Sequence, residues 1–118
     1  MAQTKVKPEL ISGGFTTIEA LTPASTINVD YDSAQVFTLT PNASTTLNII
    51  DPIIGVQKNI VITGGGGSYT ITLNVNGSAN TFNKIAGDYD DTANTKNLYS
   101  ILCVNTNEFW YSISQIAT

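Results

Sequence analysis

Apolar and small polar residues alternate along most of the chain after residue 24. Thr26–Tyr31 and Ser68–Val75 are the clearest cases, with an apolar residue at every second position. A period of two, built from Thr, Val, Ile and Tyr, is typical of strands with one buried face. The pattern predicts half-buried antiparallel strands.

Turn-forming residues divide this region into seven or eight short segments. The predicted strands are Thr26–Tyr31, Gln35–Thr40, Thr45–Ile50, Gln57–Thr63, Ser68–Val75, Thr81–Ile85 (a short edge strand), Asn97–Val104 and Phe109–Gln115. The turns at 64–67 and 105–108 each suggest a hairpin. We expect an all-β fold, a single antiparallel β-sandwich or small jelly-roll-like barrel of about 7–8 strands.

The predicted core takes one face of each strand. Its members are Ile27, Val29, Phe37, Leu39, Leu47, Ile49, Ile60, Ile62, Ile71, Leu73, Leu102 and Val104. Cys103 is the single cysteine, so no intramolecular disulfide forms. It lies in an apolar run, and no histidine or arginine is present to lower its pKa, so we expect a buried, unreactive thiol.

Residues 1–23 differ from the rest and predict an extended N-terminal arm in front of a β-sandwich domain at 24–118. Pro8, the Gly13–Gly14 pair and Pro23 interrupt this stretch, and only Thr16–Leu21 could form a short turn of helix. Leu10, Ile11 and Phe15 make it more apolar than most disordered tails. A disordered terminus and an arm that orders on a neighbouring subunit both remain open.

Phe109, Trp110 and Tyr111 are adjacent in the last strand, so they must point to both of its faces. If Trp110 faces inward, its two neighbours face outward, and the reverse also holds. An outward aromatic residue marks a buried contact, which favours a subunit interface. Packing of all three within one subunit remains the alternative. With Leu10, Ile11 and Phe15 they are the predicted interface residues.

Composition argues against catalysis. The 118 residues form one domain, and only 12% are charged, against about 25% in typical soluble domains. Histidine and arginine are absent, which removes a Ser-His pair and the usual means of gripping phosphate. The net charge of −4 argues against nucleic acid. We expect no enzyme, no cofactor and no metal, in a soluble protein without a signal peptide or membrane helix.

Two local motifs have weak chemical interpretations. Gly64–Gly67 leads into a strand, whereas a phosphate-binding loop leads into a helix, so a hairpin tip is favoured. Asp30–Asp32 and Gly87–Asp91 are acidic clusters that could share a cation such as Ca²⁺. A solvated loop is favoured for both, and cation binding at 88–91 stays open.

The order of strands and turns over residues 24–115 resembles a β-rich module of tailed-bacteriophage virion proteins, found in head fibres, capsid decoration proteins and tail-fibre segments. The segments that carry the resemblance are Ile27–Asp32, Gln35–Thr40, Ser44–Ile49, Gly55, Gly64–Leu73 and Asn107–Tyr111. The resemblance implies a homo-oligomer, often a trimer, located in the virion.

The first functional hypothesis is a capsid decoration or cement protein that binds the major capsid protein through its arm and stabilises the lattice. Nothing in the chain looks repetitive or shaft-like, which argues against a complete tail fibre. A small tail fibre, baseplate or adsorption component is the second hypothesis. The third is a carbohydrate-binding β-sandwich that stacks surface glycans on Tyr31, Tyr89 or Trp110.

Overall fold

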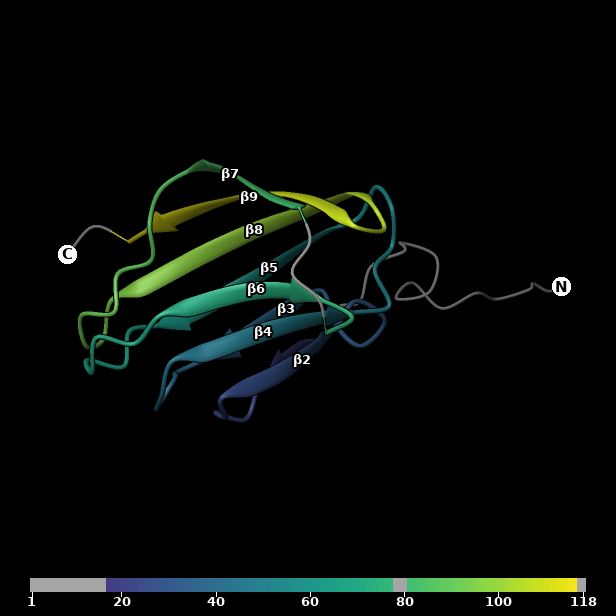
Figure 1. Cartoon of the computed structure of the whole chain (residues 1–118). Coiled ribbons are helices and arrows are strands. Elements are labelled where there is room, and N and C mark those ends of the chain that lie inside the picture. The colour runs from purple at the N-terminus through teal and green to yellow at the C-terminus, as the bar shows by residue number, and fades with distance from the viewer. Residues whose placement is uncertain (1–16, 78–80, 117–118) are drawn as a thin grey trace, which may run out of the picture.

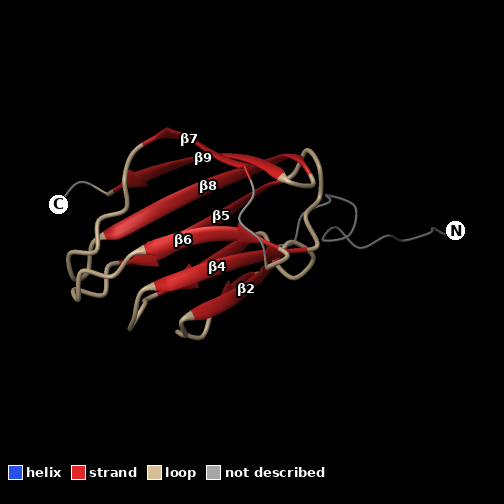
Figure 2. Ribbon diagram, viewed as in Figure 1, coloured by secondary structure: helices blue, strands red, loops and turns tan. Residues whose placement is uncertain are grey.

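The computed structural model describes residues 17–77 and 81–116, and this part of the chain is all β, with nine strands and no helix (Figures 1 and 2). The strands are β1 Ile18–Ala20, β2 Thr26–Asp30, β3 Val36–Leu39, β4 Thr45–Ile50, β5 Gln57–Thr63, β6 Ile71–Val75, β7 Thr81–Ala86, β8 Lys96–Asn105 and β9 Glu108–Gln115.

The first six strands coil between two sheets. β1, β3 and β5 lie side by side in one sheet, and β2, β4 and β6 form the other, with every neighbouring pair parallel. The first sheet then continues through β8, β9 and β7 to six strands, in the order β1-β3-β5-β8-β9-β7. β8 is antiparallel to β5 and β9 to β8, while β7 is parallel to β9. The result is a β-solenoid of about four turns.

The predicted antiparallel sandwich or jelly-roll barrel is therefore wrong. Alternation reports that one face of a strand is buried, but parallel coils and antiparallel hairpins produce the same alternation. Gly64–Gly67 is not a hairpin tip, because β5 and β6 belong to different sheets and the loop carries the chain from one to the other. The hairpin at 105–108 is confirmed, since β8 and β9 pair antiparallel around it.

Like residues stack on like in the three-stranded sheet. The register aligns Thr26, Thr46 and Thr72 in one row and Asn28, Asn48 and Asn74 in another, with aliphatic rows between them. The Nδ2 group of Asn48 donates to Oδ1 of Asn28 at 3.0 Å. A Thr-apolar-Asn-apolar unit thus occurs in β2, β4 and β6, so the chain does contain a short repeat, contrary to expectation.

The core lies between the two sheets. Eight of the predicted core residues are buried, namely Ile27, Val29, Phe37, Leu39, Leu47, Ile49, Ile60 and Ile62. Ile71 and Leu73 are half-buried beside it. The prediction that Leu102 and Val104 belong to the core is wrong, because β8 buries Tyr99, Ile101 and Cys103 on its inner face instead.

Part of the predicted arm belongs to the solenoid. Ile18–Ala20 is strand β1, parallel to β3, and Leu21 is buried, so the predicted helical turn at Thr16–Leu21 is wrong. The edge strand predicted at Thr81–Ile85 is confirmed as β7. Leu10, Ile11 and Phe15 lie outside the described residues.

Candidate functional site

The carboxylate of Asp91 organises the glycine-rich loop. Its Oδ1 accepts a hydrogen bond from the N–H of Gly65 at 3.0 Å, and its Oδ2 accepts from Gly67 at 3.0 Å and Tyr69 at 2.9 Å. The hydroxyl of Tyr89 also donates to Oδ1. Three backbone donors converge on one carboxylate, so the loop is an anion cradle already filled by the protein itself.

The charge of Asp91 matches this role. Burial alone would raise the pKa of its carboxyl, but the hydrogen bonds from Tyr89, Gly65, Tyr69 and Gly67 outweigh burial and lower the pKa. The ionised form is therefore the one that the fold stabilises. We assign Asp91 a structural part, as the residue that fixes the crossing between the two sheets.

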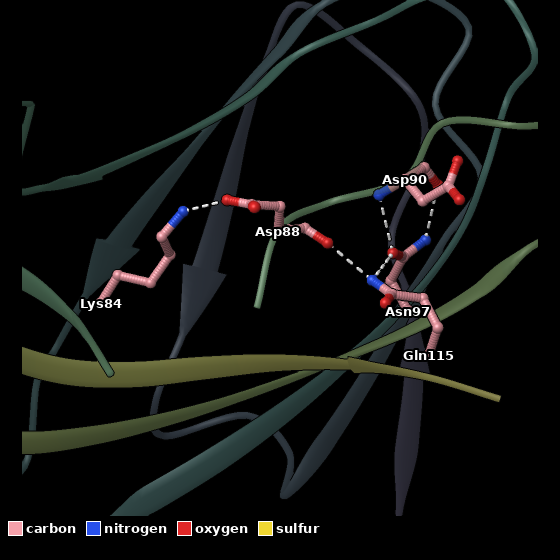
Figure 3. A network of polar contacts seen from close by, with 5 residues as sticks. All are labelled: Lys84, Asp88, Asp90, Asn97 and Gln115. Atoms are coloured by element: carbon pink, nitrogen blue, oxygen red, sulfur yellow. Dashed lines mark hydrogen bonds and ion pairs between the residues drawn. The ribbon is translucent and has the colours of Figure 1, made fainter. Parts of the chain in front are cut away.

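The rest of the acidic loop is tied to the ends of β8 and β9 (Figure 3). Asn97 is fully buried; its Nδ2 donates to the carbonyl of Asp90 at 2.9 Å, and its Oδ1 accepts from the N–H of Asp90. Gln115 donates to Asn97 and to the carbonyl of Asp88. Asp88 forms an ion pair with Lys84. Both Asp88 and Asp91 thus have protein partners, which supports a structural rather than a cation-binding loop.

A second group of carboxylates lies at the ends of β2 and β4. Oxygen atoms of Asp30, Asp32 and Asp51 lie within 4.8 Å of one another. A hydrogen bond with Asp30 and the charges of both neighbours raise the pKa of Asp51. The buried Lys58 supplies positive charge nearby: burial lowers its pKa, while Asp32 and Asp30 oppose that shift. A lysine in this place competes with any cation for the three carboxylates.

A groove opens beside β6, where the three-stranded sheet ends and the larger sheet continues. Its volume is about 350 Å³. We call it the aromatic groove; it is lined by Ile71, Thr72, Leu73, Phe82, Lys84, Tyr89, Tyr99, Tyr111 and Ile113. The rings of Tyr99 and Tyr111 stack 6.3 Å apart, and Phe82 meets Tyr111 edge to face at 6.4 Å. These aromatic side chains line the groove and pack against one another, which fixes their positions.

The outer face of the six-stranded sheet carries a second apolar surface, which we call the outer patch: Val61, Leu98, Leu102 and Trp110. Trp110 is 46% exposed and Leu98 is 40% exposed. Trp110 lies directly opposite Leu102 across the β8–β9 ladder, and Leu98 lies opposite Val61 across the β5–β8 ladder.

The three aromatic residues of β9 divide between these surfaces. Phe109 is fully buried and stacks on Phe82 at 4.8 Å, so it belongs to the core. Tyr111 lines the aromatic groove, and Trp110 points outward. Of the residues considered for glycan stacking, Tyr31 is fully buried and donates its hydroxyl to a carbonyl of β8, so it cannot meet a sugar.

The sequence did not predict the aromatic groove, and it left open which of the three aromatic residues of β9 face inward. The spacing of Phe82, Tyr89, Tyr99 and Tyr111 has no local period, because these residues meet only through the sheet order β8-β9-β7. The one available signal was the repeated Thr-apolar-Asn unit, which predicts parallel stacking and hence a sheet with a free edge at its last copy.

Comparison with protein-family models, curated proteins and solved structures finds no match to this chain. Within residues 17–77 and 81–116 there is no helix long and apolar enough to cross a membrane.

Proposed function

We propose that this protein is a structural subunit that associates with copies of itself, as a capsid decoration or cement protein of a bacteriophage. The observation that carries the self-association is Trp110, nearly half exposed on a regular sheet face beside Leu102. Tryptophan is the residue type most enriched among interface hot spots. The sheet face around Trp110 is a surface against which a second copy of the protein can pack.

The surroundings of Trp110 support an interface. Along the outward positions of β8 and β9, charge occurs only near the ends, at Lys96 and Glu108. Between them lie three serines, Val104 and the outer-patch residues of these two strands, and the carboxylate of Glu108 accepts a hydrogen bond from the indole N–H of Trp110 at 3.0 Å. Depletion of charge at the centre with a charged rim is the composition of protein interfaces.

The virion location rests on the resemblance of the strand and turn order to phage virion modules. A solenoid in which backbone N–H groups bind the carboxylate of Asp91, and whose chain contains no histidine, suits a scaffold better than an enzyme. A subunit that binds only the assembled lattice stabilises that lattice by mass action. The partner on the particle is then the major capsid protein.

Sedimentation velocity tests the self-association. The wild-type chain is expected to form oligomers at micromolar concentration, and Trp110→Ser is expected to weaken association at least about tenfold, a typical hot-spot effect. Ile18→Ser is the matched control, because Ile18 is 66% exposed on β1, four strands away from β9 in the six-stranded sheet. Thermal unfolding should be similar for both variants. A wild-type chain that remains monomeric would refute the proposal.

Copy number in purified virions separates the decoration role from a tail role, since decoration needs many copies and a tail fibre or baseplate part needs few. A glycan array tests the remaining alternative. Trp110 and the half-buried Tyr89 are the aromatic residues still open to a sugar, although the hydroxyl of Tyr89 is already bound to Asp91.

A further inference from the structure

Among the residues that the structure describes, β6 is an edge strand of the three-stranded sheet and pairs with β4 alone (Figure 1). Hydrogen bonds join Thr70 and Asn76 to β4, through Thr45 N–H to the Thr70 carbonyl and through Asn76 N–H to the Ile49 carbonyl. Backbone groups alternate sides along a strand. The N–H and C=O groups of the odd-numbered residues 71, 73 and 75 therefore point away from β4. An edge of this kind is a template for another strand.

The aromatic groove lies directly beside that edge, and its lining includes Ile71 and Leu73 of β6 with Tyr99 of β8 and Tyr111 of β9. A strand added to β6 would turn alternate side chains into the groove. The other side chains would extend the outer face beyond Thr72 and Asn74. The edge thus supplies backbone hydrogen-bonding groups and the groove supplies a surface for side chains, so that together they can accept one further strand.

We propose that residues 2–7 of a second copy of this chain occupy that position. The segment reads Ala-Gln-Thr-Lys-Val-Lys and ends at Pro8, so it alternates small or apolar residues with polar ones. Ala2, Thr4 and Val6 share one face, and their small side chains suit a groove already walled by rings. The opposite face carries Gln3 and two lysines, which keeps it in water.

Charge favours the same occupant. Residues 17–118 contain three lysines and eight carboxylates, a net charge of −5, whereas Lys5 and Lys7 make the segment positive. Electrostatic attraction of this sort raises the rate of encounter and fixes which partner is accepted.

The donor segment and the acceptor groove lie at different places along the six-stranded sheet. Thr17 precedes β1, at one end of the six-stranded sheet, and the groove lies three strands away over β8, about 14 Å at the usual strand spacing. Residues 8–16 can span about 30 Å when extended, so the chain's own segment also reaches the groove, and the mixing experiment below distinguishes the two donors. A donor segment at one place and an acceptor groove at another is a head-to-tail arrangement, which forms a ring where the rotation between copies closes and a filament where it does not. The inference thus rests on the proposed self-association.

Hydrogen exchange of the Leu73 amide tests the docking directly. In the full-length wild-type chain this amide is expected to exchange at least about tenfold more slowly at high than at low protein concentration. Val6→Asp places a charge against the rings and should abolish the protection. Lys5→Ser, on the outward face of the same segment, is the matched control and should retain it.

A mixing experiment identifies the donor. ¹⁵N-labelled Val6→Asp chain is mixed with unlabelled wild type, so that only a second copy can supply a competent segment. Recovery of Leu73 protection supports the proposal, and continued fast exchange overturns it in favour of the chain's own segment. Equal, fast exchange in wild type and variant overturns docking itself. Sedimentation of the same samples distinguishes that result from failure of self-association, in which wild type is monomeric.

Discussion

Asp91→Asn should destabilise the protein although the two side chains have the same shape. An asparagine can offer one oxygen, to Gly67 and Tyr69, but its amide group then faces the N–H of Gly65, and that hydrogen bond is lost. A hydrogen bond to a charged group contributes about 1.5–3 kcal/mol, and a neutral acceptor weakens the two that remain. Because the site is partly exposed, we expect a loss of about 2–3 kcal/mol in the free energy of unfolding, or roughly 10 °C in Tm.

Urea unfolding at neutral pH measures this loss, with Asp88→Asn as the control. Asp88 has the same charge in the same loop, but its ion pair with Lys84 is exposed, so its removal should leave the free energy of unfolding nearly unchanged. The pKa of Asp91 is lowered in the folded state, so its contribution is present above the unfolded value of about 4 and disappears as the pH falls through the folded value.

The gap between wild type and Asp91→Asn should therefore shrink on acidification below about pH 4. An Asp91→Asn variant as stable as Asp88→Asn would show that the converging N–H groups do not depend on the carboxylate charge. A gap that persists unchanged in acid would show that the loss comes from distortion rather than from charge.

Three further outcomes follow from the packing. Gly64→Ala should cost about 3 kcal/mol or more in urea unfolding, because the added methyl overlaps the carbonyl oxygen of Thr92; Gly77→Ala, where the added methyl meets open space, should cost about 1 kcal/mol, from its positive φ alone. Tyr31→Phe should lower stability by about 1 kcal/mol in the same assay, since a carbonyl of β8 loses its donor. The thiol of Cys103 should fail to react with a disulfide reagent until the protein unfolds, because burial raises its pKa.

Sequence patterns located most strands but not their partners. In β2 to β5 the alternation placed Val29, Phe37, Leu47 and Ile60 correctly in the core, because small polar residues separate them. Alternation contains no information on whether the next strand runs parallel or antiparallel. The four glycines between β5 and β6 were equally consistent with a hairpin and with a crossing to the other sheet, and only the sheet order distinguishes these.

The face of β8 was unpredictable for a different reason. Its middle reads Leu-Tyr-Ser-Ile-Leu-Cys-Val, which is apolar on both faces, so either phase buries apolar surface. The structure buries Tyr99 and Ile101 and leaves Leu98 and Leu102 on the outer patch. The ambiguity has a physical origin. A strand that packs against the core with one face and carries an apolar surface on the other shows no clear alternation of apolar and polar residues.

The rows of threonine and asparagine also bear on how such a chain can change in length. Each Thr-apolar-Asn-apolar unit pairs with the unit before it in the same register, and the reversed strand β8 closes the series at β5. A duplicated or deleted segment of one full coil, cut in corresponding turns, would preserve every row and leave the β8–β9 hairpin unchanged. The molecule would grow or shrink by about 4.8 Å, one strand spacing, at each step. Its height is then an adjustable property, independent of the surfaces at its ends.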